Sequence, residues 1–157
     1  MTDLEMMREA CKEADRNAAN GFVEGGPFGA VIVKDGEIIA RGKNNVLANC
    51  DPTAHAEVSA IREAGRALGT HDLSGCTLYT SCYPCPMCLS AIIWSNITDV
   101  YYGNTKEDAA AIGFRDDFIY EILKDLENNQ TIHLVPLERT TAISTFEAFK
   151  NSSGTLY

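Results

Sequence analysis

Three potential metal ligands stand in two short motifs, and each motif is predicted to open a helix. The first motif is His55-Ala56-Glu57 and the second is Pro84-Cys85-Pro86-Met87-Cys88. Apolar runs at residues 77–80 and 100–102 predict strands on either side of the helix that carries the second motif. A strand, a helix and a strand at this spacing imply a right-handed crossover between parallel strands. We therefore expect the second motif to lie in an α/β fold.

An amphipathic helix and a hairpin are expected before the first motif. Apolar residues recur at helical spacing over residues 3–20, at Leu4, Met7, Cys11, Ala14 and Ala18. Residues 21–29 are rich in glycine and predict a loop. Two strands at residues 30–33 and 38–40 flank Asp35-Gly36, a dipeptide typical of a hairpin turn.

The two motif helices and a last strand complete the predicted architecture. Asp51-Pro52 is expected to open the first motif's helix, since Asp is a good N-cap and Pro is favoured at the first helical position. The other helix runs from Pro84 to about Ser95, and a short strand lies near residues 131–135. The core positions expected in that helix are Leu89, Ile92 and Ile93. The pattern predicts a single α/β domain over residues 1–157, a three-layer α/β/α sandwich with a mixed five-stranded sheet.

The acidic composition argues against a nucleic-acid partner. The formal net charge is −9, and the sequence has no cluster of Lys and Arg that could follow a phosphate backbone. We therefore expect a small neutral ligand. No apolar run reaches the length of a bilayer span, and the residues from Met1 to Glu5 lack the basic-then-apolar order of a secretory signal. These features predict a cytoplasmic protein with no membrane partner.

The three potential ligands predict a catalytic zinc site. Cys85 and Cys88 share one face of a first helical turn, where the positive end of the helix dipole stabilises thiolates. His55 adds a neutral nitrogen, and three protein ligands leave the fourth tetrahedral position open for water, which zinc makes acidic. We expect one Zn²⁺ per subunit. In a first helical turn the side chain of Glu57 can converge with that of His55, so Glu57 is expected to move protons rather than to bind the metal.

Each motif alone also fits a less specific role. A lone Cys-x-x-Cys marks redox pairs and structural zinc sites as well. A closed structural site is disfavoured because no fourth Cys or His stands at suitable spacing, and Cys82 is expected to be a buried apolar residue. The remaining cysteines and histidines are expected to be structural or solvent-facing, and they are Cys11, Cys50, Cys76, His71 and His133.

The two motifs in this order resemble the cytidine-deaminase-like superfamily of zinc deaminases. Three blocks carry the resemblance, at residues 25–33, at Asn44-Asn45 with residues 51–57, and at residues 80–88. These blocks are shared with tRNA adenosine deaminases and cytosine deaminases, so they imply the reaction class and leave the substrate open. Residues 113–120 and the terminal Tyr157 resemble the small bacterial guanine deaminases. Tyr83 departs from the family, which usually has Glu there, and is expected to affect only the rim of the pocket.

The resemblance implies a role for several further residues. Asn44 would read the base edge, Phe28 and Trp94 would form apolar walls, and Ala54 would lie at the substrate. Asp116 would accept ring N–H groups and move a proton, and the backbone N–H of Cys85 would help to hold substrate or water. A homodimer is also implied, in which exchanged C-terminal segments bring Tyr157 over the partner's pocket.

Structural roles for these residues stay open at this point. The aromatic residues would also fit a core, Asp116 a solvated helix face, Asn44 a strand end and Tyr157 a disordered terminus. The implied activity is zinc-dependent hydrolysis of guanine to xanthine and ammonia, with Glu57 moving the protons. The alternatives are deamination of cytosine, cytidine, guanosine or an aminotriazine, a tRNA adenosine deaminase, and a structural zinc-binding module without catalysis.

Overall fold

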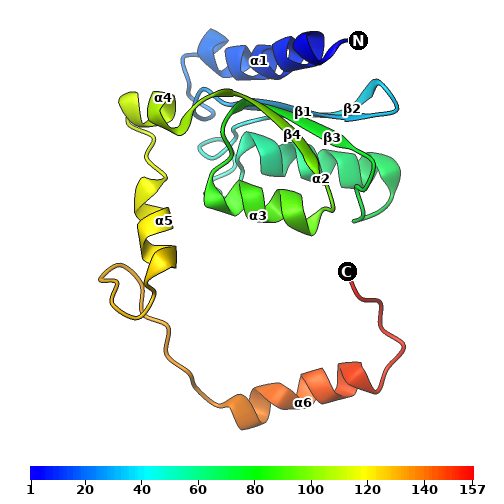
Figure 1. Ribbon diagram of the computed structural model, residues 1–157, viewed down its shortest axis with the longest axis vertical. Helices are drawn as coiled ribbons and strands as arrows, with labels where there is room; N and C mark the ends of the chain where they lie inside the picture. Colours follow the sequence, from blue (N-terminus) through cyan, green and yellow to red (C-terminus); the bar gives the residue numbers. More distant parts are fainter. The chain divides into compact units, whose positions relative to one another are not determined.

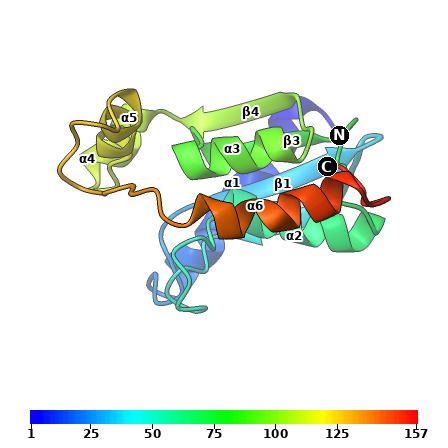
Figure 2. The ribbon, with the colours of Figure 1, turned by 90° about the horizontal axis from the view of Figure 1, so that it is seen from below.

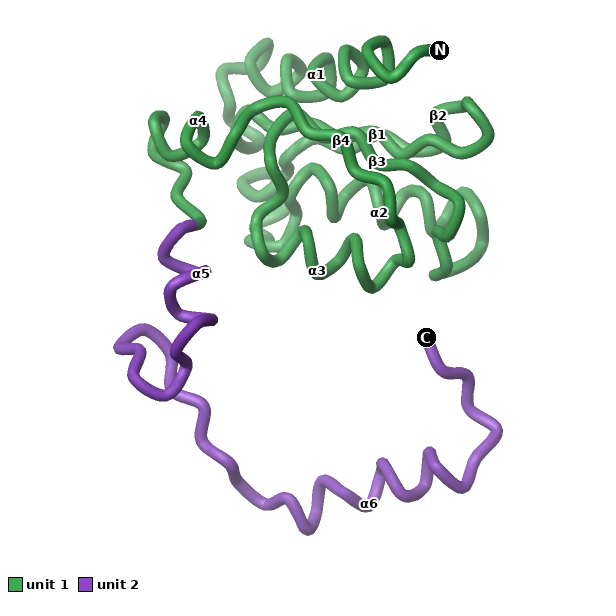
Figure 3. Tube along the Cα trace, viewed as in Figure 1, with its two compact units in different colours: residues 1–116 green, residues 117–157 purple.

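The computed structural model describes all residues from 1 to 157 (Figure 1). The chain divides into two compact units, residues 1–116 and residues 117–157 (Figure 3). The first unit contains the whole sheet and both ligand motifs. The single domain expected over the full chain therefore stays a prediction. None of the helices has the length and apolar composition that a bilayer span requires.

Four strands form the sheet of the first unit: β1 (Gly29–Lys34), β2 (Glu37–Lys43), β3 (Thr77–Cys82) and β4 (Asp99–Asn104). Their order is β2-β1-β3-β4. β1 is antiparallel to both β2 and β3, whereas β3 and β4 are parallel, as predicted for the crossover. Asp35 and Gly36 both have positive φ, at 50° and 80°, which is the backbone of a two-residue hairpin turn.

Helices cover both faces of this sheet. α1 (Asp3–Ala19) lies on one face, and α2 (Ala56–Leu68) and α3 (Pro86–Trp94) lie on the other (Figure 1). Figure 2 shows α2 and α3 next to each other, and the two helices pack together. α4 (Lys106–Ala111) follows β4. The three-layer α/β/α prediction is confirmed.

Strand β1 joins the two cores that hold these layers together. Its residues are buried on both faces, and they alternate between the cores with the period of two expected for a strand. Val31 and Val33 pack in the core under α1, whereas Ala30 and Ile32 pack in the core under α2 and α3. The fold of the first unit thus centres on the strand that follows the glycine-rich loop.

The predicted faces of two helices were partly wrong. α1 exposes Leu4 and Cys11 and buries Met6, Ala10, Glu13 and Asn17 instead. Two of these buried residues are polar, and polar partners from other elements satisfy them, so hydrophobic spacing pointed to the wrong face. In α3, Ile92 is buried as expected, but Ile93 is exposed because it faces away from the sheet.

The start of α2 and the number of strands also differ from the predictions. Asp51 accepts a hydrogen bond from the Thr53 backbone N–H, so it forms a local turn, and α2 begins only at Ala56. The sheet has four strands rather than five, since residues 131–135 form no strand. These residues lie in the second unit, where no strand is present to pair with their backbone groups.

The second unit consists of two helices and connecting segments. Its helices are α5 (Asp117–Lys124) and α6 (Arg139–Lys150), and neither buries a residue. Large apolar side chains are exposed throughout it, among them Leu134, Val135, Leu137 and Phe146. This amount of exposed apolar surface is unusual for a segment that remains in water.

Candidate active site

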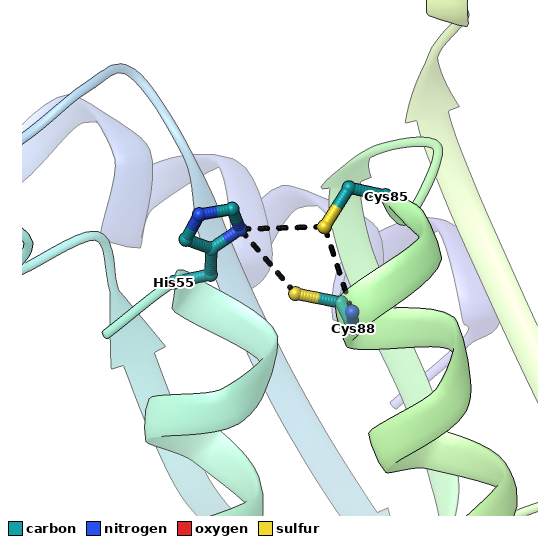
Figure 4. Close-up of side chains that lie close together, drawn as sticks. All are labelled: His55, Cys85 and Cys88. Atoms are coloured by element: carbon teal, nitrogen blue, oxygen red, sulfur yellow. Dashed lines mark hydrogen bonds between the residues drawn. The ribbon is translucent and has the colours of Figure 1, made fainter. Parts of the chain in front are cut away.

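The side chains of His55, Cys85 and Cys88 converge on one point (Figure 4). His55 Nδ1 lies 3.5 Å from Cys85 Sγ and 3.5 Å from Cys88 Sγ. In a tetrahedral site with Zn–N of about 2.0 Å and Zn–S of about 2.3 Å, the nitrogen and each sulfur lie about 3.5 Å apart. All three ligand atoms lie within 4.8 Å of one another. The donor set and its spacing therefore fit one zinc ion.

The starts of two neighbouring helices place these ligands. His55 is the N-cap of α2, and Cys85 is the N-cap of α3, where its sulfur accepts the Cys88 backbone N–H at 3.5 Å. Pro86 follows Cys85 as the first residue of α3, a position that proline favours. Both helix N-termini carry partial positive charge toward the cluster, which stabilises thiolates there.

Hydrogen bonds within this cluster shift the pKa values of all three side chains. Hydrogen bonding to Cys88 and to His55 lowers the pKa of Cys85 to about 4. The hydrogen bond to Cys85, followed by burial, raises the pKa of Cys88. The hydrogen bond to Cys85 raises the pKa of His55 as well. Zinc binds thiolates, so metal binding releases any proton that these two thiols hold.

Glu57 lies in the first turn of α2 and is only 5% exposed. One of its oxygens, Oε1, accepts the Thr80 hydroxyl at 2.7 Å. Burial raises the pKa of Glu57. A buried carboxyl with a raised pKa can both accept and return a proton near neutral pH. The structure thus places a suitable base beside the metal ligands, outside the ligand set itself.

A cavity of about 390 Å³ opens onto this cluster, and its size is typical of small-molecule sites. His55, Cys85 and Glu57 line it. Three other predicted site residues also line the cavity, and they are Phe28, Asn44 and Asp116. Asp116 is half-buried, and its charge contributes to the raised pKa of His55. Predicted residues from four separate stretches of sequence therefore meet in one cavity.

The aromatic wall of the cavity is a pair of phenylalanines. Phe28 and Phe114 pack edge to face, with ring centroids 5.0 Å apart. Phe114 was not predicted as a site residue, although it stands in the 113–120 segment that carried the resemblance. Cys82 also lines the cavity, and burial raises its pKa to about 11, so it remains a neutral thiol.

The Asn44 side chain is oriented by the protein backbone. Its Oδ1 accepts hydrogen bonds from the backbone N–H groups of Val46, at 3.1 Å, and Gly26, at 3.4 Å. No hydrogen bond within the protein uses its Nδ2, so the amide has donors to offer to a ligand. The loop approaches Asn44 closely, because a Cβ at Gly25 would lie 2.3 Å from Asn44 Oδ1.

Three predicted substrate contacts lie outside the cavity of the first unit. Trp94 is 69% exposed at the last position of α3, whose first turn holds the metal ligands. Pro86 and Trp94 are the two ends of this 9-residue helix, about 12 Å apart along the axis, and Trp94 does not line the cavity of its own unit. Ala54 is fully buried, and its carbonyl accepts the Asn45 N–H. Tyr157 is exposed at the end of the second unit.

Tyr83, the departure from the resemblance, lines the cavity. Its ring packs edge to face against Tyr102, with centroids 4.9 Å apart, and Lys106 Nζ lies 4.5 Å from its ring centroid. The ring is therefore held between an aromatic and a cationic neighbour, and a glutamate at this position would lack the contact with Tyr102.

Comparisons with known proteins agree with this site. Residues 1–104 match the family model of the cytidine and deoxycytidylate deaminase zinc-binding region. The chain is 53% identical over 127 residues to guanine deaminase of Bacillus subtilis, which covers 81% of each chain. The crystal structure of guanine deaminase from Bacillus subtilis superposes with a TM-score of 0.93 and 45% identity, over 100% of this chain and 99% of that one. The tRNA-specific adenosine deaminase of Bacillus subtilis is 46% identical over 104 residues, 66% of this chain and 63% of that one.

We predict that the purified protein carries one zinc per chain and that Cys85→Ser loses most of it. A serine hydroxyl is not ionised at neutral pH and is a poor replacement for the thiolate. Cys11→Ser is the matched control, because Cys11 is exposed and outside the ligand cluster. Elemental analysis by mass spectrometry measures both variants. Full zinc content in Cys85→Ser would contradict the assigned ligand set.

Proposed function

Since this chain belongs to the cytidine and deoxycytidylate deaminase zinc-binding family, we propose that it is a zinc-dependent aminohydrolase that converts guanine to xanthine and ammonia. The observation that carries the proposal is the single cavity in which His55, Cys85, Glu57, Asn44 and Asp116 meet. Guanine deaminase of Bacillus subtilis, which is 53% identical over 81% of each chain, supports the choice of base. The net charge of −9 supports a free base rather than tRNA.

The proposed chemistry assigns one task to each group near the metal ligands. Zinc bound by His55, Cys85 and Cys88 would supply the acidity that makes water a nucleophile at neutral pH. Glu57 takes the proton from the attacking water and passes it to the ring nitrogen beside the amino-bearing carbon. It then moves the proton of the newly added hydroxyl to the amino nitrogen. The bond between this nitrogen and the ring carbon breaks as the carbonyl forms, and ammonia departs. Thr80 holds one oxygen of the carboxyl in place during these transfers.

In this proposal one residue of the cavity donates a hydrogen bond to the base and another accepts one from it. Asn44 Nδ2 donates to an acceptor on the base edge, since Oδ1 is already bonded to the backbone. Asp116 accepts a ring N–H and can hold a proton that moves during the reaction. Phe28 and Phe114 supply apolar contact for the planar ring.

We further propose a cytoplasmic homodimer in which the partner's C-terminal segment completes the site. β4 is an edge strand, and its Tyr101 and Tyr102 are exposed. The exposed apolar residues of the second unit are of the kind that a subunit interface covers. Tyr157 and Trp94 have their proposed substrate roles in such a dimer, and Ala54 supports the cavity through its backbone. Six free cysteines agree with a reducing compartment.

Ammonia release from a panel of bases tests the proposed activity. We expect guanine to be turned over faster than cytosine, adenine, cytidine, guanosine and an aminotriazine. Glu57→Gln should keep its zinc and lose at least about 10²–10⁴-fold in kcat, because the amide cannot accept the proton. A protein that releases no ammonia from guanine, or a Glu57→Gln variant with wild-type turnover, would refute the corresponding step.

The Asp116 carboxylate is tested by Asp116→Ala. We expect kcat/KM for guanine to fall by about 10²-fold or more, because a hydrogen bond to a charged group and a proton acceptor are both lost. Zinc content should not change, since Asp116 lies outside the ligand set. Steady-state kinetics and metal analysis together measure the two quantities, and wild-type kcat/KM would remove the role of Asp116.

Complementation tests the proposed exchange of C-terminal segments. Tyr157→Ala and Glu57→Gln should each be weakly active as pure dimers. Co-expressed chains form mixed dimers, in which one site combines an intact Glu57 with the partner's intact Tyr157. Random pairing of equal amounts should restore about a quarter of the wild-type sites. No gain over the separate variants, or a monomer by light scattering, would contradict the exchange.

A further inference from the structure

A polar side chain that the proposed chemistry does not use lies buried in α1. Asn17 is 0% exposed, because it lies on the face of α1 that packs on the sheet. A buried amide without partners would destabilise the fold, so its hydrogen bonds indicate what it holds in place. Those bonds lead to the wall of the cavity.

The Asn17 amide bonds the backbone at two points on the cavity wall. Its Nδ2 donates to the carbonyl of Gly26 at 2.8 Å and to the carbonyl of Asn44 at 2.8 Å. Gly26 belongs to the glycine-rich loop, and Asn44 follows β2, so the two carbonyls come from segments 18 residues apart. Both residues line the cavity. The two N–H groups of one side chain thus hold two parts of the wall at a fixed separation.

Lys43 fixes the orientation of this amide. Its Nζ donates to Asn17 Oδ1 at 3.1 Å, to Asn45 Oδ1 at 2.8 Å and to the Glu24 carboxylate. Three acceptors match the three N–H groups of the ammonium. Because an ammonium can only donate, the oxygen of Asn17 must face Lys43 and the NH₂ must face the two carbonyls.

We infer that Asn17 is a positioning residue for base recognition. Gly26 N–H and Val46 N–H in turn hold Asn44 Oδ1, so the orientation of the Asn44 amide depends on where the loop and the strand end lie. The Asn17 amide sets that placement from the opposite side, without contact to the base. This inference rests on the recognition role proposed for Asn44.

Asn17→Asp tests the inference with almost no change in size. A carboxylate can still accept from Lys43, but it cannot donate to the carbonyls of Gly26 and Asn44. We expect the KM for guanine to rise by about 10- to 100-fold, because two buried carbonyls lose their donor. The kcat should fall by less than the KM rises, and zinc content should stay at the wild-type level.

Two controls separate positioning from general loss of stability. Tyr79→Phe removes the hydrogen bond from the Tyr79 hydroxyl to Asp3, at the other end of α1, and should lower Tm without changing KM. In an Asn44→Ala background, adding Asn17→Asp should raise KM by less than about threefold, since the side chain that Asn17 positions is absent. If Asn17→Asp does not fold, Asn17→Ser keeps one donor and should give a smaller rise in KM.

Hydrogen–deuterium exchange measures, without substrate, how firmly the two segments of the cavity wall are held. Asn17→Asp should speed amide exchange around residues 25–28 and 44–46, whereas exchange in β3 should not change. A wild-type KM and wild-type exchange in Asn17→Asp would overturn the inference, and so would an equal rise in KM with and without Asn44. Failure of the wild-type protein to deaminate guanine would instead overturn the proposed function, and the exchange experiment would still decide the role of Asn17.

Discussion

The site depends on one constraint, which is that the N-termini of α2 and α3 meet at the same point. α3 begins just beyond the end of β3, and α2 packs beside it with its own N-terminus toward the same cluster. Each start supplies a cap residue as a ligand, and each brings unpaired N–H groups that favour negative charge. Two thiolates and a buried carboxylate can therefore share a small volume. A shift of either helix would separate the ligand atoms, and a shift of α2 would also move Glu57, which lines the cavity.

The cavity wall is assembled from backbone held by buried polar groups. α1 contributes Asn17, and β2 contributes Lys43, yet neither residue lines the cavity. Their hydrogen bonds satisfy one another completely, which is the condition under which a buried polar network adds order rather than instability. The glycine-rich loop needs this support, because its lack of side chains permits many backbone conformations. Sequence features far from the metal ligands thus determine the shape of the site.

The local motifs made the ligand set predictable, whereas the cavity wall depended on tertiary contacts. Cys85 and Cys88 stand at a helix start that proline marks in the sequence, whereas Asp51-Pro52 predicted the start of α2 too early and His55 is its N-cap. The face of α1 was not predictable from periodicity, because Glu13 and Asn17 replace apolar residues and their partners stand 26 to 28 residues away. Trp94 lies at the opposite end of α3 from the metal ligands, so its predicted contact with substrate depends on the proposed dimer and stays a prediction. The fifth strand is absent because residues 131–135 lie in the second unit, which contains no strand to pair with them.

The contacts proposed for Asn44 and Asp116 would favour guanine over adenine. With Asn44 Oδ1 bonded to the backbone, the amide offers only donors, so the base edge near it must offer acceptors. In the proposed recognition, Asp116 takes the opposite role and accepts a ring N–H. Guanine has carbonyl O6 and N7 as acceptors and N1–H as a donor, whereas adenine has no N–H at N1. A base that leaves the buried Asn44 amide without an acceptor would bind more weakly, since an unpaired buried group costs about 1–3 kcal/mol. The choice between bases would therefore depend on the hydrogen bonds that the protein already makes at Asn44, as much as on the size of the cavity.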